Sequence, residues 1–206
     1  GIKVDFFGGD KQETMKLYED ILSDANDYGL EVIFHGCTMP RGWERMYPNY
    51  VSSEAALASE NVYFTDYHAK KEAFEMTMHP FSRNAVASFD WGGVMMNKYF
   101  SKDNKSRHQR YTSDVFEMAT AITNQSSVNC ICLYPNNLQD VPQWELDWLK
   151  NVPTAWEDTR FNAGYPTKYA VVARKSSVEN GSGAALTAGR WFVGGLNATD
   201  KPLALT

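Results

Sequence analysis

The chain has 206 residues, of which 43% are hydrophobic and 22% are charged, and its formal net charge is −5 at pH 7. These values are typical of a globular protein with a sizeable core. The acidic balance argues against a nucleic-acid-binding protein, because phosphate binding requires a basic surface. No apolar run approaches the ~20 residues that a membrane span requires, so the sequence predicts no transmembrane helix.

The first apolar run, at residues 2–7, carries an aspartate near its end. Its sequence, IKVDFF, predicts a buried β-strand, and a charge inside such a strand needs a reason. In a β/α barrel, catalytic groups lie where the strands end at the C-terminal rim, which makes Asp5 a candidate. The alternative is a structural ion pair between Asp5 and Lys3, whose side chains share one face of the strand.

A βαβ unit is predicted from this strand onward. Asp10 and Glu13 have the spacing of a capping box, and Gly29 provides a helix stop before a second strand at 31–36. Between them, apolar side chains recur at helical spacing: Tyr18, Ile21, Leu22, Ala25 and Tyr28. Such a unit favours a parallel sheet with helices packed outside it.

The alternation of strands and helices continues to about residue 152. A long irregular stretch at 37–63 is aromatic and rich in Arg and Pro, which indicates a functional loop, and it includes a predicted short helix at 52–60. Further helices are predicted at 67–78, 112–123 and 143–150, and strands at 85–89 and 128–133. Strand starts near 2, 31, 85 and 128 suit half of an eight-stranded barrel. After residue 153, short strands at 155–161, 169–174, 190–196 and 203–205 predict an antiparallel β region.

Several acids and a histidine fall where a barrel gathers its functional groups. Asp5, His35 and Asp90 end predicted strands, and Glu54 and Glu60 follow the second strand. Carboxylates in one cleft, without a Ser/His/Asp or Cys/His set, point to acid/base chemistry on a neutral substrate. Glycoside hydrolysis needs such a pair, since one acid protonates the leaving oxygen and the other attacks or activates water.

Each of these groups also has a structural interpretation. On a straight helix, Glu54 and Glu60 would point about 120° apart, so only one of them would reach the cleft. The functional interpretation makes His35, Arg45 and Asp90 substrate-binding residues. Equally, His35 fits a hydrogen-bonded core histidine, Asp90 a turn cap, and Arg45 an ion pair that holds the loop.

Taken together, these motifs resemble glycoside hydrolase family 97. The likeness covers essentially the whole chain in the family's order, and the ordered set is far more specific than any one motif. The motifs are IKVDFF at 2–7, FHG at 34–36, PRGWERMYPN at 40–49, SE at 53–54, ASEN at 58–61, HPFSRN at 79–84, VPTAWEDTR at 152–160 and YAVVAR at 169–174.

The resemblance implies a fold, a calcium requirement and a location. Family members have an N-terminal β-sandwich, a central (β/α)8 barrel and a C-terminal β domain, and they depend on Ca²⁺. The implied fold class is therefore α/β, with residues 1–174 as the C-terminal half of a (β/α)8 (TIM-type) catalytic barrel. Residues 175–206 would begin the C-terminal β-sandwich domain. An N-terminal part of the same polypeptide would complete the site, in a periplasmic or secreted bacterial protein.

The resemblance also assigns catalytic roles. Retaining members carry an aspartate nucleophile that matches Asp5, whereas inverting members place a glutamate at the position of Gly36, so the chain resembles the retaining branch. The general acid/base falls on Glu60 and a calcium ligand on Glu54.

The implied protein is a retaining hydrolase of α-galactosides or α-glucosides that forms a covalent glycosyl-enzyme intermediate. Two alternatives stay open at this point. One is another retaining α-glycosidase barrel with a different acid/base. The other is a non-catalytic carbohydrate-binding or scaffold protein.

Overall fold

The computed structural model describes residues 1–177 and 189–204. Its N-terminal part is a parallel sheet in the order β1-β2-β3, formed by β1 (Ile2–Val4), β2 (Val32–Phe34) and β3 (Tyr50–Ser53). A parallel bridge between Ser53 and Phe89 extends this pairing, and β4 (Val94–Met95) pairs in parallel with β5 (Ile131–Cys132). The predicted parallel arrangement is confirmed for these strands.

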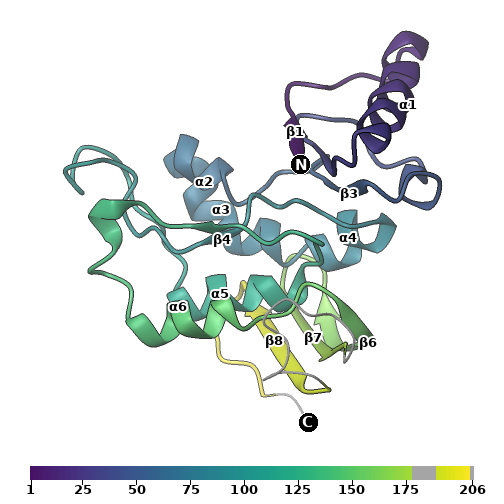
Figure 1. Ribbon diagram of the computed structural model, residues 1–206. Helices are drawn as coiled ribbons and strands as arrows, with labels where there is room; N and C mark the ends of the chain where they lie inside the picture. The colour runs from purple at the N-terminus through teal and green to yellow at the C-terminus, as the bar shows by residue number, and fades with distance from the viewer. Residues whose placement is uncertain (178–188, 205–206) are drawn as a thin grey trace.

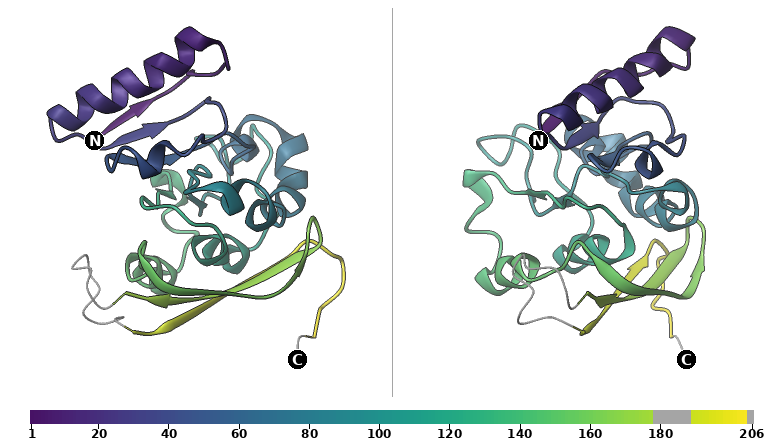
Figure 2. Two further views of the ribbon diagram at one scale, coloured as in Figure 1. Left: turned by 90° about the vertical axis from the view of Figure 1, so that its right-hand side faces the viewer. Right: turned by 45° about the vertical axis from the view of Figure 1, so that its right-hand side comes forward.

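Helix α1 (Gln12–Asp27) connects β1 to β2 and covers the sheet, as Figure 2 shows. Tyr18, Leu22 and Ala25 of the predicted apolar stripe are buried against the sheet. Gly29 has a φ of +65°, which fits the predicted helix stop. The predicted capping box is wrong: Lys11 occupies the N-cap position, and Asp10 instead accepts a hydrogen bond from Thr38.

Two predicted elements differ in the middle of the chain. The predicted helix at 52–60 is wrong, because β3 pairs with β2 through residues 50, 52 and 53 and an irregular segment follows it. The predicted strand at 85–89 is also wrong. Helix α4 (Arg83–Val86) occupies its first two residues, and Phe89 alone pairs with β3. At residues 52 and 53, tertiary pairing overrides a weak local propensity.

The remaining helices follow the predicted pattern closely. Helix α6 has its predicted bounds, and α3 and α5 begin and end within two residues of theirs. They are α3 (Asp66–Met76), α5 (Asp114–Thr123) and α6 (Gln143–Lys150), with short helical segments η1 (Trp43–Arg45), α2 (Asn61–Phe64), η2 (His79–Phe81) and η3 (Pro135–Asn137). No helix in the described part of the chain combines the length and hydrophobicity of a bilayer span.

The C-terminal part is an antiparallel sheet of β6 (Trp156–Tyr165), β7 (Tyr169–Ser176) and β8 (Trp191–Asn197). Helix α5 packs on this sheet (Figure 1). Gly194 permits the close approach, since a Cβ there would lie 2.7 Å from Cβ of Ile122. The sheet and the parallel part therefore share one core.

The predicted division into domains stays a prediction, because its boundary at 174/175 falls inside β7, which is hydrogen-bonded on both sides. The predicted strand at 203–205 is absent at Leu203 and Ala204, and residue 205 lies outside the described residues. Residues 178–188 of the predicted C-terminal domain also lie outside them.

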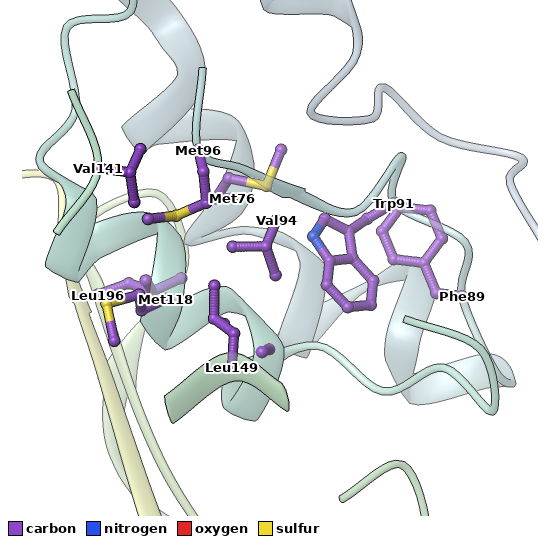
Figure 3. Close-up of a cluster of buried hydrophobic side chains, with 10 residues drawn as sticks. Met76, Phe89, Trp91, Val94, Met96, Met118, Val141, Leu149 and Leu196 are labelled. Carbon is purple, nitrogen blue, oxygen red and sulfur yellow. The ribbon is translucent and has the colours of Figure 1, made fainter. Parts of the chain in front are cut away.

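The largest buried apolar cluster joins the two parts of the chain (Figure 3). Phe89, Trp91 and Val94 come from the segment that follows the parallel sheet, Met118 comes from α5, and Leu196 comes from β8. Each is 6% exposed or less. This cluster fixes the backbone at Asp90, because the residues on either side of it, Phe89 and Trp91, are both buried in the cluster.

Two buried glutamates join α3 to α5. Glu72 and Glu117 are both fully buried, and Thr112 Oγ1 lies 2.9 Å from Glu72 Oε2 and 2.5 Å from Glu117 Oε1. A hydroxyl has one proton, so it donates to one carboxylate and accepts from a protonated one. Burial raises the pKa of Glu117 to about 7 and also raises the pKa of Glu72.

We expect the free energy of unfolding to fall as the pH rises from about 4.5 to about 7. In this window the folded state binds more protons than the unfolded state, because Glu117 is raised from its usual pKa of 4.5. At pH 8 the cost amounts to up to about 3 kcal/mol. Glu117→Gln should remove much of this dependence in urea unfolding at pH 5 and pH 8. Glu13→Gln, on the exposed face of α1, is the matched control and should leave the slope unchanged.

Candidate active site

Four carboxylates surround one buried imidazole at the end of β2. His35 is 2% exposed, and its Nδ1 lies 3.3 Å from Glu54 Oε2, 3.7 Å from Glu60 Oε1 and 4.0 Å from Asp5 Oδ1. Its Nε2 lies 3.4 Å from Asp90 Oδ2. The structure therefore brings together five of the six residues that the sequence predicted for the site.

Asp5 is held at the edge of the sheet by its own backbone. The Phe6 amide donates to Asp5 Oδ1 at 2.6 Å, and Phe6 has a φ of +55°, a conformation that is uncommon outside glycine. The turn is fixed from the β2 side, where the His35 amide donates to the Val4 carbonyl at 2.8 Å. Asp5 keeps a half-exposed carboxylate that faces solvent on one side and His35 on the other.

Gly36 has no side chain, and this leaves room for the Asp5 carboxylate. Its φ is +52°, and a Cβ at this position would lie 3.3 Å from Asp5 Oδ1 and 3.1 Å from the Phe6 nitrogen. A side chain here would be strained by its backbone and would crowd the carboxylate. The Gly36 amide also donates to Glu54 Oε2 at 2.6 Å, so this glycine touches two of the acids.

Glu54 is a largely buried acid next to Gly36. Burial raises its pKa, and the Gly36 N–H and the His35 imidazole oppose this shift only in part. The backbone of Glu54 is fixed by Arg83, whose Nε donates to the Glu54 carbonyl at 2.7 Å.

Glu60 sits just before α2 and is fixed through its neighbour, Ser59. The Ser59 amide donates to the Trp91 carbonyl and its hydroxyl donates to the Gly93 carbonyl, both at 2.6 Å. Gly92 permits this contact, since a Cβ there would lie 2.9 Å from the Glu60 nitrogen. Because residues 54–60 do not form a helix, both glutamates reach His35.

Asp90 is the buried member of the set. Its Oδ2 pairs with Lys3 Nζ at 3.4 Å, and its Oδ1 accepts from the Gly92 amide at 3.1 Å. Burial alone would raise its pKa, but His35, Lys3 and the Gly92 N–H outweigh burial and hold the pKa below its usual range. The first strand thus pairs Lys3 with Asp90, and no ion pair between Lys3 and Asp5 is found among the described residues.

Burial lowers the pKa of His35, but the Asp90 contact and the charges of Glu54 and Asp90 outweigh it, so the pKa is raised. The ring contacts at 3.3–4.0 Å are charge contacts rather than short hydrogen bonds. A positively charged imidazole would balance part of the surrounding negative charge, which makes His35 the electrostatic centre of the site.

Sequence reasoning missed two supporting residues and included one, Arg45, that the structure places apart from the cluster. Lys3 was considered only as a partner of Asp5, and the buried Arg83 was seen only as part of the 79–84 motif. An arginine close to the apolar and small residues at 85–89 was the available signal. Arg45 lies exposed at the end of η1 and does not contact His35, so its substrate-binding role stays a prediction.

Three of these side chains offer donor atoms that could hold a metal ion. His35, Glu54 and Glu60 each offer a ligand atom, and these atoms lie within 4.8 Å of one another. Ca²⁺ takes six to eight oxygen ligands, so the two carboxylates fit it while the imidazole nitrogen suits a transition metal better. The Glu54 carboxylate therefore fits one position of a calcium shell.

Comparison with known proteins gives a consistent result. The family model of glycoside hydrolase 97 matches residues 1–56, the segment that carries Asp5, His35 and Glu54. A probable retaining alpha-galactosidase of Streptomyces bingchenggensis (strain BCW-1) is 30% identical over 95% of the chain. Residues 1–56 therefore belong to glycoside hydrolase family 97, and the rest of the chain aligns with the same relative. The chain spans 27% of the length of this relative.

Solved structures agree with this membership. A crystal structure of a beta-arabinopyranosidase matches with a TM-score of 0.88 and 54% identity, over 98% of the chain and 31% of that protein. A family 97 enzyme from Pseudoalteromonas sp. strain K8, in complex with acarbose, matches with a TM-score of 0.74 over 91% of the chain and 27% of that protein. Its identity of 18% supports the fold alone.

We expect Arg83→Lys to destabilise the protein by about 2–4 kcal/mol. The buried guanidinium donates to the carbonyls of Glu54, Ser53, Ala87 and Ser88, and a lysine cannot replace this fork. Urea unfolding measures the loss. The control is Arg41→Lys, where an exposed guanidinium makes a 3.4 Å contact with Asp10. Equal stability of the two variants would contradict the role of Arg83.

Proposed function

We propose that this chain contributes the acid/base and nucleophile half of a retaining α-glycoside hydrolase. The observation that carries the proposal is the convergence of Asp5 and Glu60 on one nitrogen of His35, with Gly36 keeping the space beside Asp5 open. A scaffold protein has no need for an exposed acid on a strained turn at the edge of a parallel sheet.

The separation of the two carboxylates is compatible with this chemistry. Each has an oxygen within 4.0 Å of His35 Nδ1. Those oxygens can therefore be at most about 8 Å apart, whereas retaining enzymes hold their carboxyl groups about 5–5.5 Å apart. The limit alone does not separate retention from inversion, and the choice rests on Asp5 and Gly36. A base on residue 36 would crowd Asp5.

In the proposed reaction, Asp5 attacks the anomeric carbon while Glu60 donates a proton to the departing glycosidic oxygen. The carbon–oxygen bond to the leaving group breaks as the bond to Asp5 forms, which gives a glycosyl ester. Glu60, now ionised, accepts a proton from water, and the water oxygen displaces Asp5. Two displacements at one carbon return the original configuration. His35 and Asp90 would bind substrate hydroxyls at the floor of this site.

We infer that residues 1–174 form the second half of a (β/α)8 barrel. The parallel strands with α1 outside them and the acids at their C-terminal ends support this. The remainder of the polypeptide would supply the other strands, the rest of the pocket wall and the domain that continues after β8. A periplasmic or secreted location follows from the family resemblance.

We propose Ca²⁺ as a cofactor held in part by Glu54. When bound, the ion supplies positive charge that orients sugar hydroxyls and favours the ionised form of nearby carboxyls. Glu54 is suited to this role because burial raises its pKa, so a cation would relieve the cost of its charge. The other oxygen ligands would come from the rest of the polypeptide.

The relatives favour a galacto-configured substrate. One carries the name alpha-galactosidase and the other beta-arabinopyranosidase. A β-L-arabinopyranoside has the ring configuration of an α-D-galactopyranoside without the hydroxymethyl group on C5. A single site for this ring serves both substrates, so we propose α-galactosides and β-L-arabinopyranosides ahead of α-glucosides.

We expect Asp5→Ala in the full-length protein to lower kcat on an aryl α-galactoside by at least about 10³-fold, because no covalent intermediate forms. Added azide should restore turnover and give the β-galactosyl azide. With the unmodified protein, NMR should show α-galactose as the first product. Asp20→Asn, on the exposed face of α1, is the matched control. A β-configured first product would exclude retention, and near-normal turnover by Asp5→Ala would exclude the nucleophile.

Removal of calcium should abolish turnover, and added Ca²⁺ should restore it. Glu54→Gln should weaken Ca²⁺ binding at least about tenfold in calorimetry, since it removes one charged oxygen ligand. Glu44→Gln, in η1 and away from His35, should bind Ca²⁺ normally. Unchanged affinity in Glu54→Gln would remove this residue from the proposed calcium shell.

A further inference from the structure

A hollow of about 480 Å³ lies beside Glu60. It is lined by Glu60, Tyr63, Phe64, Tyr134, Gly92, Met95 and residues 131–133. Asp5, His35, Glu54 and Asp90 are not part of this lining. Glu60 therefore borders both the hollow and the His35 cluster.

The position of Glu60 determines where the leaving group lies in the reaction proposed above, and the inference rests on that proposed function. The sugar that is attacked by Asp5 must lie on the Asp5 side of Glu60. The oxygen that Glu60 protonates stays attached to the leaving group, so that group extends to the other side of the acid. The hollow is the space that the described residues leave there.

The aromatic rings of the hollow are arranged to accept a sugar ring. Tyr134 is 44% exposed and Phe64 is 57% exposed. Both rings stand nearly perpendicular to that of Tyr63, at centroid distances of 6.0 and 5.8 Å. Arg107 covers Tyr63, with its guanidinium 4.3 Å from the ring centroid. Tyr63 therefore supports the other two rings, which keep surface free for a ligand.

Backbone contacts fix these rings relative to Glu60. The Tyr134 amide donates to Oδ1 of the buried Asn97 at 2.6 Å. Arg107 donates to the Tyr63 carbonyl at 2.5 Å, and His108 Nε2 contacts the Val62 carbonyl at 2.6 Å, so the segment at 107–108 holds α2 in place. A pre-formed pocket of a few hundred Å³, with aromatic walls and one acid, is typical of a small-ligand site.

We propose that this hollow binds the leaving group, and that its ligand is a second sugar ring whose apolar C–H face stacks on Tyr134 and Phe64. Such a ring carries no charge, which matches a lining whose one charged group is Glu60. The site then selects glycosides in which galactose or arabinose is attached to another sugar. Tyr134 is a positioning residue that acts on the group Glu60 protonates.

The test compares two substrates in the full-length protein: melibiose, whose leaving group is glucose, and α-galactosyl fluoride. Fluoride fills no leaving-group site and departs without a proton from Glu60. Tyr134→Ala should lower the ratio of kcat/KM on melibiose to kcat/KM on the fluoride by about fivefold or more, because remote binding contributes to the transition state only where the leaving group is present.

Three variants make the result decisive. Tyr134→Phe keeps the ring and should hold the ratio near its original value, and Tyr165→Ala, an exposed tyrosine at the end of β6, should do the same. Phe64→Ala replaces Tyr134→Ala if the latter does not fold. A ratio that falls by less than about fivefold overturns the leaving-group site while the fluoride is still hydrolysed. Failure of the unmodified protein to hydrolyse either substrate overturns the proposed function and, with it, this inference.

Discussion

The contact of one buried imidazole with four carboxylates is the constraint on which the site depends. His35 is nearly inaccessible to water, yet four acids from three segments lie within 4.0 Å of its nitrogens. Carboxylates at this density repel one another. Lys3 beside Asp90 offsets part of this repulsion, a protonated His35 would offset more because its pKa is raised, and a divalent ion would complete the balance.

Backbone amides orient the carboxylates of the site. Three of the four acids are oriented by a main-chain group: the Phe6 amide for Asp5, the Gly36 amide for Glu54 and the Gly92 amide for Asp90. These amides lie in turns directly after parallel strands, where the chain leaves the sheet. The apolar cluster around Phe89 and Trp91 keeps that edge rigid, so packing remote from the acids sets their positions.

Sequence patterns predicted the parts of this structure that depend on local periodicity. The apolar stripe of α1, the bounds of α6 and the acids at strand ends were all readable. The segment at 52–60 was not, because its alanines and glutamates favour a helix while pairing with β2 extends its first residues. Lys3 and Arg83 were missed for the same reason, since their partners lie 87 and 29 positions away and only tertiary contact reveals them.

The narrow space over Gly36 also bears on how such enzymes diverge. A Cβ at this residue would approach the Asp5 carboxylate at 3.3 Å and the Phe6 backbone at 3.1 Å, so a bulkier residue would require both to shift. With Asp5 in its proposed role as nucleophile, substitutions at positions 36 and 5 would therefore be coupled. A substitution at position 36 alone would leave a crowded carboxylate, and one at position 5 alone would leave none.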